Sequence, residues 1–473
     1  MGTSDYLIVH VSPVGMGMSR WSVGHSHSER TICHINPHFR KEIKTMLSRR
    51  QFIEWCGRIC LALGITSVLP NSAKAAVTQN GYHIPADYTN SLSNVEFIQQ
   101  ILTNPADTCR TIMWQTKKKL GTPQLEYRMI KSEQALWGQV SVDYLEQQGN
   151  GTFIYACRLT GLTPGADYEF RIANGSRATG WMPITTVHPG HFQMLIFADS
   201  QCENYSVWRN IAEAAHYRHP NAALATVIGD LTDNGQFYYH WKGWYEGAEN
   251  LLKSHIFVPV MGNHECYDPQ WQMCLPEGYL RHFVVPHNQS TRFPGYYYSF
   301  DYGDVHFIVL NNQFEELDGL KPGLYNEQRQ WFLHDIRKNH CPWKVVLMHK
   351  DVIEYESPSP TQGDVYINEI GKNFMPDFET CGIDLVVTGH LHVYRNRRHI
   401  LKGRPSDNGP VYVLCGLSGD QLYSVPISRE FDKATAPQPE NASYITLDAD
   451  EEELRLRCYL TDGKLIDDML LKK

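Results

Sequence analysis

Residues 222–235 read AALATVIGDLTDNG. Positions 222–228 are small or apolar almost throughout, which is typical of a strand buried on both faces of an α/β fold. The run ends at Gly229, and the acidic residues Asp230 and Asp233 follow at once. In such folds the functional groups gather beyond the carboxyl ends of the strands. This stretch therefore predicts a layered α/β protein with its chemistry at the strand ends.

The same succession of apolar strand, polar loop and helix recurs across residues 190–473. Strands are predicted at Phe192–Ala198, Ala222–Gly229, His255–Met261, Val305–Asn311, Trp343–His349 and Asp384–Thr388, and helices at Tyr205–His216, Tyr238–Lys253 and Asn326–Lys338. Residues from Val411 onward, including Tyr444–Leu471, return to a strand pattern and are expected to close a second sheet. Five strand ends carry residues that can bind metal: Asp199 and Gln201, Asp230, Asn263, His349, and His390 with His392.

Residues 76–189 instead contain short runs in which apolar and polar residues alternate, a pattern typical of an all-β sandwich. In the stretch Leu159–Tyr168, Tyr168 is placed to bond the loop backbone as a tyrosine corner, and Trp114 is expected at the centre between the sheets. The segment resembles a fibronectin type III domain, and more closely the amino-terminal domain of purple acid phosphatases. Packing alone accounts for its residues, so we expect a structural role.

Composition excludes several classes of protein. Hydrophobic residues make up 42% and charged residues 20% of the 473 positions, as in globular proteins. The formal net charge of -8 argues against a broad basic surface for nucleic acid. No apolar run reaches the roughly 20 residues needed to cross a bilayer, so no integral membrane association is expected.

The amino-terminal segment resembles an export signal. Ser48–Ile53, SRRQFI, resembles the bacterial twin-arginine signal, and Ala73 and Ala75 suit cleavage after Ala75. Residues 1–75 are therefore interpreted as a mispredicted start (1–45) followed by a signal peptide, and the mature protein is expected in the periplasm or otherwise outside the cytoplasm. Of the 12 cysteines, Cys266 and Cys274 are the closest pair after this segment, and the sequence leaves any disulfide open.

The order of the strand-end residues carries a further resemblance. The series Asp, Gly-Asp, Gly-Asn-His-Glu, His and Gly-His-x-His over residues 192–420 resembles the signature of calcineurin-like metallophosphoesterases. Residues 296–310, YYYSFDYGDVHFIVL, are similar to the corresponding part of purple acid phosphatases. The resemblance implies a four-layer α/β/β/α metallophosphoesterase sandwich over residues 190–473, preceded by the all-β domain.

The resemblance also implies two divalent metal ions, with Mn, Fe or Zn suited to the mixed oxygen and imidazole ligands. Asp230 would bridge both ions. Asp199, His392 and Gln201 would complete the first set, and Asn263, His349 and His390 the second. His264 would face the leaving group, with Asp233 orienting it.

Two positions depart from the family pattern. Gln201 stands where many metallophosphoesterases have histidine, and an amide oxygen is a weaker ligand. Asp233 stands where purple acid phosphatases have the tyrosine that gives the iron centre its colour, so a colourless protein is predicted. Lys350 and Arg292 are candidate substrate contacts, with a solvated surface position as the simpler interpretation of both.

The predicted function is an exported phosphoesterase that hydrolyses small-molecule phosphate monoesters by attack of a metal-bound hydroxide. One alternative keeps the metals but takes a phosphodiester, because selectivity would lie in loops such as Cys266–Pro294. A second alternative is a binding or adhesive protein whose phosphoesterase fold is inactive. The sequence leaves the natural substrate and the oligomeric state open.

Overall fold

The computed structural model describes residue 88 and residues 90–187, 190–355, 365–423, 430–437 and 442–473, together with two short strands near the amino end. The chain divides into two units, residues 1–78 and 79–473. In the first, β1 (Ile8–Ser12) pairs with β2 (Arg20–Gly24) in antiparallel fashion. The predicted twin-arginine stretch and cleavage site lie outside the described residues.

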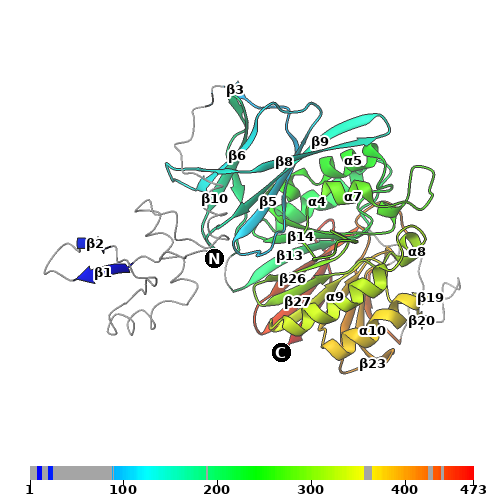
Figure 1. The fold of residues 1–473 in the computed structure, drawn as a ribbon. Helices are drawn as coiled ribbons and strands as arrows, with labels where there is room; N and C mark the ends of the chain where they lie inside the picture. The colour runs from blue at the N-terminus through cyan, green and yellow to red at the C-terminus, as the bar shows by residue number, and fades with distance from the viewer. Residues whose placement is uncertain are drawn as a thin grey trace. The chain divides into compact units, whose positions relative to one another are not determined.

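A ten-stranded sheet runs through the second unit (Figure 1). Its centre consists of the parallel strands β13 (Phe192–Phe197), β14 (Leu224–Ile228) and β15 (Ile256–Val260). The flanking strands, in order outward, are β26 (Ser443–Ala449), β27 (Glu453–Leu460) and β28 (Leu465–Lys472) on one side, and β4 (Glu96–Ile101), β5 (Cys109–Thr116), β9 (Asn150–Thr160) and β8 (Val140–Gln147) on the other.

The second large sheet has eight strands. Its order is β16 (Tyr298–Tyr302), β17 (Val305–Val309), β18 (Trp343–Leu347), β21 (Leu385–Thr388), β24 (Val411–Leu414), β22 (Arg395–Leu401) and β23 (Arg404–Ser406), and β25 (Asp432–Thr435) also pairs with β22. The strands from β17 to β24 run parallel. A separate hairpin joins β19 (Ile353–Tyr355) and β20 (Val365–Ile367).

The two large sheets pack face to face, and helices cover their outer faces. One apolar core lies between the sheets and includes Ile196, Val258 and Val345. The outer face of the first sheet is covered by α4 (Ser206–Arg218), α5 (Tyr238–Gly247) and α6 (Glu249–Ser254), and that of the second by α9 (Leu324–Lys338) and α10 (Glu369–Cys381). The predicted four-layer α/β/β/α sandwich is confirmed.

The predicted amino-terminal sandwich is also present. Its other sheet contains β3 (Asn90–Ser91), β11 (Arg177–Ala178), β10 (Tyr168–Asn174), β6 (Pro123–Met129) and β7 (Leu136–Gly138), with β12 (Met182–Ile184) paired to β10. Trp114 is buried between the sheets, and the Thr163 N–H donates to the Tyr168 hydroxyl at 3.2 Å, which forms the tyrosine corner.

The sandwich and the α/β region share one sheet. Strand β4 pairs in parallel with β15, so β4, β5, β9 and β8 continue the sheet that carries β13 to β15. Gln100 on β4 reinforces this junction, because its side chain donates to the Lys253 carbonyl at 2.6 Å. The predicted domain boundary lies between residues 189 and 190, and residues 188 and 189 lie outside the described ranges.

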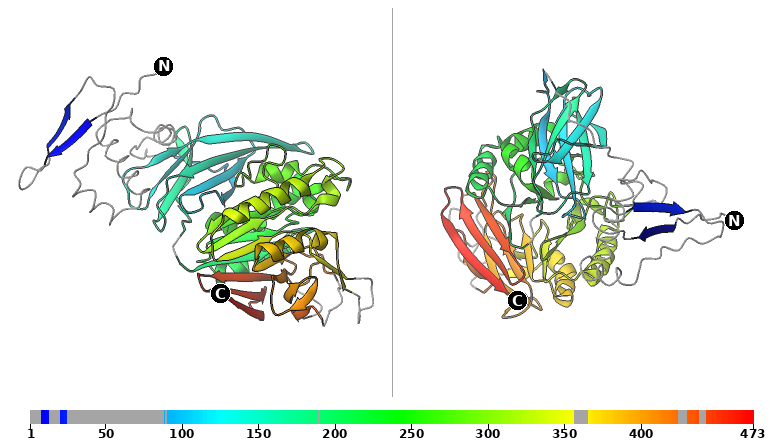
Figure 2. Two further views of the ribbon diagram at one scale, coloured as in Figure 1. Left: turned by 60° about the horizontal axis from the view of Figure 1, so that its bottom comes forward. Right: turned by 90° about the vertical axis from the view of Figure 1, so that its left-hand side faces the viewer.

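The carboxyl-terminal strands were expected in the second sheet, and this expectation is wrong for most of them. Strands β24 and β25 join the second sheet, whereas β26 pairs in antiparallel fashion with β13 of the first, and β27 and β28 extend that first sheet. Figure 2 shows the last three strands side by side in red. The edge of β13 is open to pairing, and Ile445 and Leu447 on β26 fill the core between the sheets.

Three helical details also differ from the sequence prediction. The predicted helix Tyr238–Lys253 is two helices, because the chain breaks at Ala248, after Gly247 packs tightly on Trp208. Helix α10 is not among the predicted helices, and it contains Pro376, a residue that is unfavourable in a helix interior. The short segments η1 (His264–Cys266), α7 (Glu277–His282) and α8 (Phe314–Leu317) complete the described helices. No helix in the described part of the chain is long and apolar enough to span a bilayer.

Candidate metal centre

The strand-end residues meet at one edge of the paired sheets. Asp199 and Asp230 each lie two residues beyond the neighbouring parallel strands β13 and β14, and Asn263 lies just beyond β15. In the second sheet, His349 and His390 each lie two residues beyond the neighbouring parallel strands β18 and β21. Parallel strands present their carboxyl ends at a common edge, so residues far apart in sequence converge there.

The loops that carry these side chains have unusual backbone geometry. Asp199, Asp230, His390 and His392 all have positive φ, at 51°, 49°, 78° and 56°. Such conformations cost non-glycine residues on the order of 1–3 kcal/mol each and gather at functional sites. Gly229 has a φ of 76°, and a Cβ there would lie 2.4 Å from the His349 ring. The close approach of His349 to the Asp230 loop therefore requires glycine.

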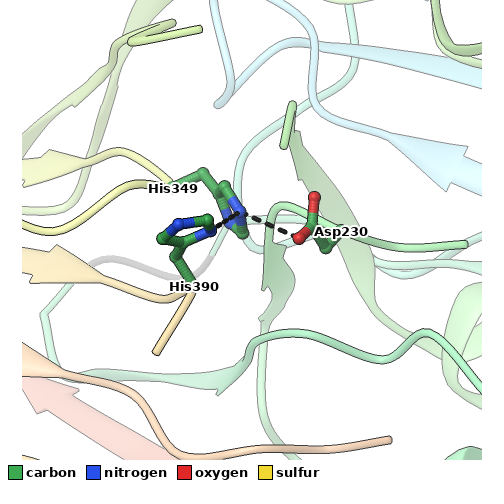
Figure 3. Close-up of side chains that lie close together, drawn as sticks. All are labelled: Asp230, His349 and His390. Carbon is green, nitrogen blue, oxygen red and sulfur yellow. Dashed lines mark hydrogen bonds and ion pairs between the residues drawn. The ribbon is translucent and has the colours of Figure 1, made fainter. Parts of the chain in front are cut away.

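Four of the predicted ligands form one tight cluster. His349 Nε2 lies 3.0 Å from Asp230 Oδ2, 3.0 Å from Asn263 Oδ1 and 3.2 Å from His390 Nδ1. Figure 3 shows Asp230, His349 and His390 pointing toward one another, and their ligand atoms all lie within 4.8 Å. His349 Nδ1 contacts the Ile228 carbonyl at 2.8 Å, which directs Nε2 into the cluster. These are the residues predicted to hold the second ion.

The first predicted set lies beside this cluster. His392 Nε2 is 3.6 Å from Asp199 Oδ1 and 3.2 Å from Gln201 Nε2. The carboxylate of Asp199 also accepts the His390 backbone N–H at 2.9 Å. His392 Nδ1 contacts the Gln421 carbonyl, which turns Nε2 toward Asp199 and Gln201.

One atom of this set tests directly whether the residues fit a cation. The Gln201 side chain is buried, and its Oε1 has no hydrogen-bond partner in the described structure. An unsatisfied buried acceptor costs about 1–3 kcal/mol, which a bound cation would offset. Oxygen and imidazole donors of this kind suit Mn, Fe or Zn. The donor set therefore fits a pair of divalent ions.

The electrostatics of the cluster also favour positive charge. Burial raises the pKa of Asp199 to about 8, and the nearby Asp230 adds to the rise. Burial alone would lower the pKa of His349, but Asp230 and Asp199 raise it to about 9. Burial lowers the pKa of His390 to about 3 and that of His392 to about 4, so both rings are neutral, as metal ligands must be. The buried carboxylates thus favour a positive charge beside them, which protonated His349 carries here and which a bound metal ion would carry instead, with His349 neutral.

His264 stands at the rim of the cluster. Its Nε2 is 3.8 Å from Asp230 Oδ2, and its backbone N–H donates to Asp230 Oδ1 at 2.8 Å. Its Nδ1 contacts the backbone carbonyl of Asp233 at 2.7 Å, whereas the Asp233 carboxylate is 3.9 Å away. Burial alone would lower the pKa of His264, but Asp230 and the Asp233 carbonyl raise it. Asp233 therefore fixes the ring through its main chain rather than its side chain.

Glu265 follows His264 and was given no role by the sequence. Its buried carboxylate accepts the backbone N–H groups of Gly262 at 2.8 Å, Leu231 at 3.0 Å, Asp230 at 3.1 Å and Thr232 at 3.3 Å. It ties the Asp230 loop to the Asn263 loop. The sequence feature that could have identified Glu265 is its place at the end of the Gly-Asn-His-Glu motif.

Gln421 and Tyr423 also reach the centre without any motif to mark them. The Gln421 carbonyl contacts His392, and its side-chain amide donates to Asp233 Oδ1 at 2.8 Å. The Tyr423 ring stacks on His392 with centroids 4.1 Å apart. Gln421 thus joins one predicted ligand to Asp233, a link across 188 positions of sequence that no local pattern announces.

The two candidate substrate contacts are engaged elsewhere. Lys350 Nζ is buried and lies 2.8 Å from Glu316 and 3.1 Å from Glu315. The Arg292 guanidinium lies 3.7 Å from Glu327 and donates to the Pro322 carbonyl. The suggestion that either contacts substrate is not supported, because nearby carboxylates and carbonyls already hold both. Cys266 and Cys274 are free thiols.

Comparison with known proteins agrees with the resemblance seen in the sequence. The profile of the calcineurin-like phosphoesterase family matches residues 192–394, and that of the purple acid phosphatase N-terminal domain matches residues 95–188. Together these regions contain the whole predicted cluster.

Individual relatives are similar over parts of their length. Purple acid phosphatase 18 of Arabidopsis thaliana is 25% identical over 42% of this chain and 44% of its own. Purple acid phosphatase 1 of Ipomoea batatas is 24% identical over 70% of this chain and 72% of its own. The chain therefore spans less than half of the Arabidopsis protein that it matches.

The fold has a counterpart among solved structures. The purple acid phosphatase PPD1 from yellow lupin (Lupinus luteus) seeds superposes with a TM-score of 0.67 at 16% identity, over 81% of this chain and 74% of the lupin chain. At that identity the likeness concerns the fold. It includes both the sandwich and the four-layer region.

Proposed function

We propose that this chain, which belongs to the calcineurin-like phosphoesterases and has a purple acid phosphatase N-terminal domain ahead of its catalytic region, is a metal-dependent phosphatase acting on phosphate monoesters. The observation that carries the proposal is the meeting of seven strand-end side chains, among them Gln201 with its unpartnered Oε1, and His264 at their rim.

Two sets of residues would hold the ions. Asp230 would be shared: its Oδ2 lies 3.0 Å from His349 Nε2 of one set, and its carboxylate is close enough to that of Asp199 in the other set to add to the rise in the pKa of Asp199. Asp199, Gln201 and His392 belong with Asp230 in one set, and Asn263, His349 and His390 in the other. When bound, two divalent ions supply a nucleophile near neutral pH and neutralise charge on the phosphoryl oxygens.

The chain's own proton donor is His264. The Asp233 carbonyl accepts from Nδ1, so the ring is fixed and Nε2 is the atom turned toward the cluster. From this position Nε2 would give a proton to the departing ester oxygen, a contribution typically worth about 10² to 10⁴ in rate.

A panel of esters and metals tests the proposal. Protein purified without chelators is assayed for metal content, then for hydrolysis of monoesters and diesters with Mn, Zn, Fe and Mg. We expect monoesters to turn over faster than diesters. Equal or faster diester hydrolysis would favour a phosphodiesterase. A protein that retains no metal and hydrolyses neither class after reconstitution would favour the binding role.

Export is a second part of the proposal and rests on the Ser48–Ile53 stretch, together with Ala73 and Ala75 at the expected cleavage site. The twin-arginine route carries folded proteins, so the metals could be loaded before export. Replacing Arg49 and Arg50 by lysine should retain the protein in the cytoplasm of a bacterial host, as measured by cell fractionation. Unchanged periplasmic recovery of this variant would contradict the assignment.

A further inference from the structure

A large aromatic side chain stands exposed beside the proposed proton donor. Trp271 is 51% exposed, and its ring lies 5.5 Å from that of His264 at an angle of 89°. Tyr267 packs against Trp271 with centroids 6.0 Å apart. Neither neighbour covers the indole fully, so much of its surface is open to solvent next to His264.

The loop that carries Trp271 is tightly built. Cys274 N–H donates to the Cys266 carbonyl at 2.8 Å and closes the loop at its base. At the tip, Asp268 Oδ1 accepts the N–H groups of Gln270 and Gln272, each at 2.8 Å. The Asn234 side chain donates to the Asp268 carbonyl at 2.7 Å, which anchors the loop to the segment after Asp230. The position of Trp271 is therefore set before any ligand arrives.

The backbone at Trp271 is itself costly. Its φ of 59° lies in the left-handed region, which a bulky residue rarely adopts. An exposed indole in a strained conformation contributes little to the core, and strain of this kind gathers at ligand sites. Met273 is 50% exposed on the same loop, so apolar surface continues beyond the indole.

We infer that Trp271 recognises an aromatic ring carried by the leaving group, which makes the preferred substrates aryl phosphates or nucleotides rather than esters of aliphatic alcohols. The inference rests on the proposed function, because His264 would mark the side from which the leaving group departs. A planar ring leaving past His264 would meet the open indole and stack on it, as aromatic pairs do in offset or edge-to-face arrangements.

Stacking on an indole changes affinity measurably. A base or ring stacked on an aromatic side chain loses roughly tenfold or more in binding when that side chain is removed. Trp271 does not touch the predicted metal ligands in the described contacts, so it acts on the leaving group and not on the phosphoryl group. It is a specificity residue for the proposed reaction.

The experiment compares three substrates in four proteins. Phenyl phosphate carries its ring on the ester oxygen, a 5′-nucleoside monophosphate carries it one ribose away, and glycerol phosphate has none. The proteins are wild type, Trp271→Ala, Trp271→Phe and Tyr217→Ala. The last is the control, because Tyr217 on α4 is an aromatic residue that is 68% exposed. All are assayed as metal-loaded full chains for kcat/KM, and for competition by inorganic phosphate.

We expect Trp271→Ala to lower the kcat/KM ratio of a ring-bearing substrate to glycerol phosphate by about tenfold. Trp271→Phe should restore most of that ratio, Tyr217→Ala should match wild type, and competition by inorganic phosphate should stay constant. A fall confined to phenyl phosphate places the ring beside the phosphorus, and a fall confined to the nucleotide places it a sugar away. Either supports the inference.

Two results would overturn it, and they differ from each other. Equal losses for all three substrates would mean that Trp271 acts only through His264, which sinks the ring inference and leaves the phosphatase proposal standing. No hydrolysis of any substrate by metal-loaded wild type would sink the phosphatase proposal itself, and the ring inference with it.

Discussion

Replacing Glu265 by glutamine should destabilise the protein strongly, although the change alters a single oxygen. The Glu265 carboxylate accepts four backbone N–H groups, from Gly262, Asp230, Leu231 and Thr232. A glutamine side chain offers one oxygen in place of two, and its NH₂ group would face N–H donors. About two backbone donors would then be left buried without an acceptor.

The size of the effect follows from that count. Each buried donor left unsatisfied costs about 1–3 kcal/mol, so Glu265→Gln should lower the free energy of unfolding by about 2–6 kcal/mol. That is a large part of the roughly 5–15 kcal/mol that holds a typical domain together. Because two of the donors belong to Asp230 and Gly262, the loops carrying Asp230 and Asn263 should also loosen and metal affinity should fall.

Urea unfolding and metal analysis measure both consequences. The matched control is Glu246→Gln on α5, where the exposed carboxylate pairs with Lys242 at 3.2 Å and the loss should be about 0.3–0.5 kcal/mol. Glu265→Asp keeps the charge but shortens the side chain, so it should rescue only in part. If Glu265→Gln unfolds at the wild-type midpoint and retains full metal content, Glu265 does not pin these loops.

Four further outcomes are expected. Asp230→Asn should abolish hydrolysis and reduce metal content while circular dichroism stays native, and retained activity would contradict the shared-ligand role. Burial lowers the pKa of His282 to about 3, against 6.5 in the unfolded chain, so the folded state holds His282 neutral and gains stability from it above pH 6.5. That stability is lost as the pH falls toward 3, and about 2 kcal/mol of the free energy of unfolding should disappear between pH 7 and pH 5. In urea unfolding, His282→Gln should lose less stability over this range than wild type. Lys350→Met leaves buried Glu316 without its partner and should cost about 3–5 kcal/mol of stability, with KM unchanged; a raised KM at normal stability would return Lys350 to the substrate site. Because Asp233 replaces the colour-giving tyrosine, iron-loaded protein should show no strong visible absorption band, and a purple product would refute this.

The sequence identified the residues that meet at the candidate metal centre because strand ends are local features with a fixed geometry. Asp199, Asp230 and His349 each follow a short apolar run, and parallel strands bring such positions together wherever they fall in the chain. The Gly-Asn-His-Glu and Gly-His-x-His motifs then separated these residues from ordinary helix caps. The alternation of strand and helix predicted a layered α/β fold, and the resemblance to calcineurin-like metallophosphoesterases implied its four-layer form.

Other features depend on contacts that no local pattern encodes. Lys350 follows a predicted ligand directly, but Glu316 on α8 holds its ammonium group. The carbonyl of Gln421 and its amide act on different residues, in a segment that has no recognisable motif. The carboxyl-terminal strands alternate clearly, yet nothing in their own residues says which sheet edge is open. These are choices of tertiary partner, and the sequence pattern leaves them undetermined.

The pairing of β4 with β15 makes the two regions of the second unit inseparable at their border. Asn263 lies three residues beyond the end of β15, so one of the predicted ligands is positioned by the strand that pairs with the sandwich. A chain cut near residue 190 would expose the backbone of β15 at Ile256 and Phe257, where β4 pairs with it, and so leave a sheet edge to which other chains can add strands. The phosphoesterase region should consequently aggregate when it is produced alone, because the sandwich is what protects this edge of its sheet.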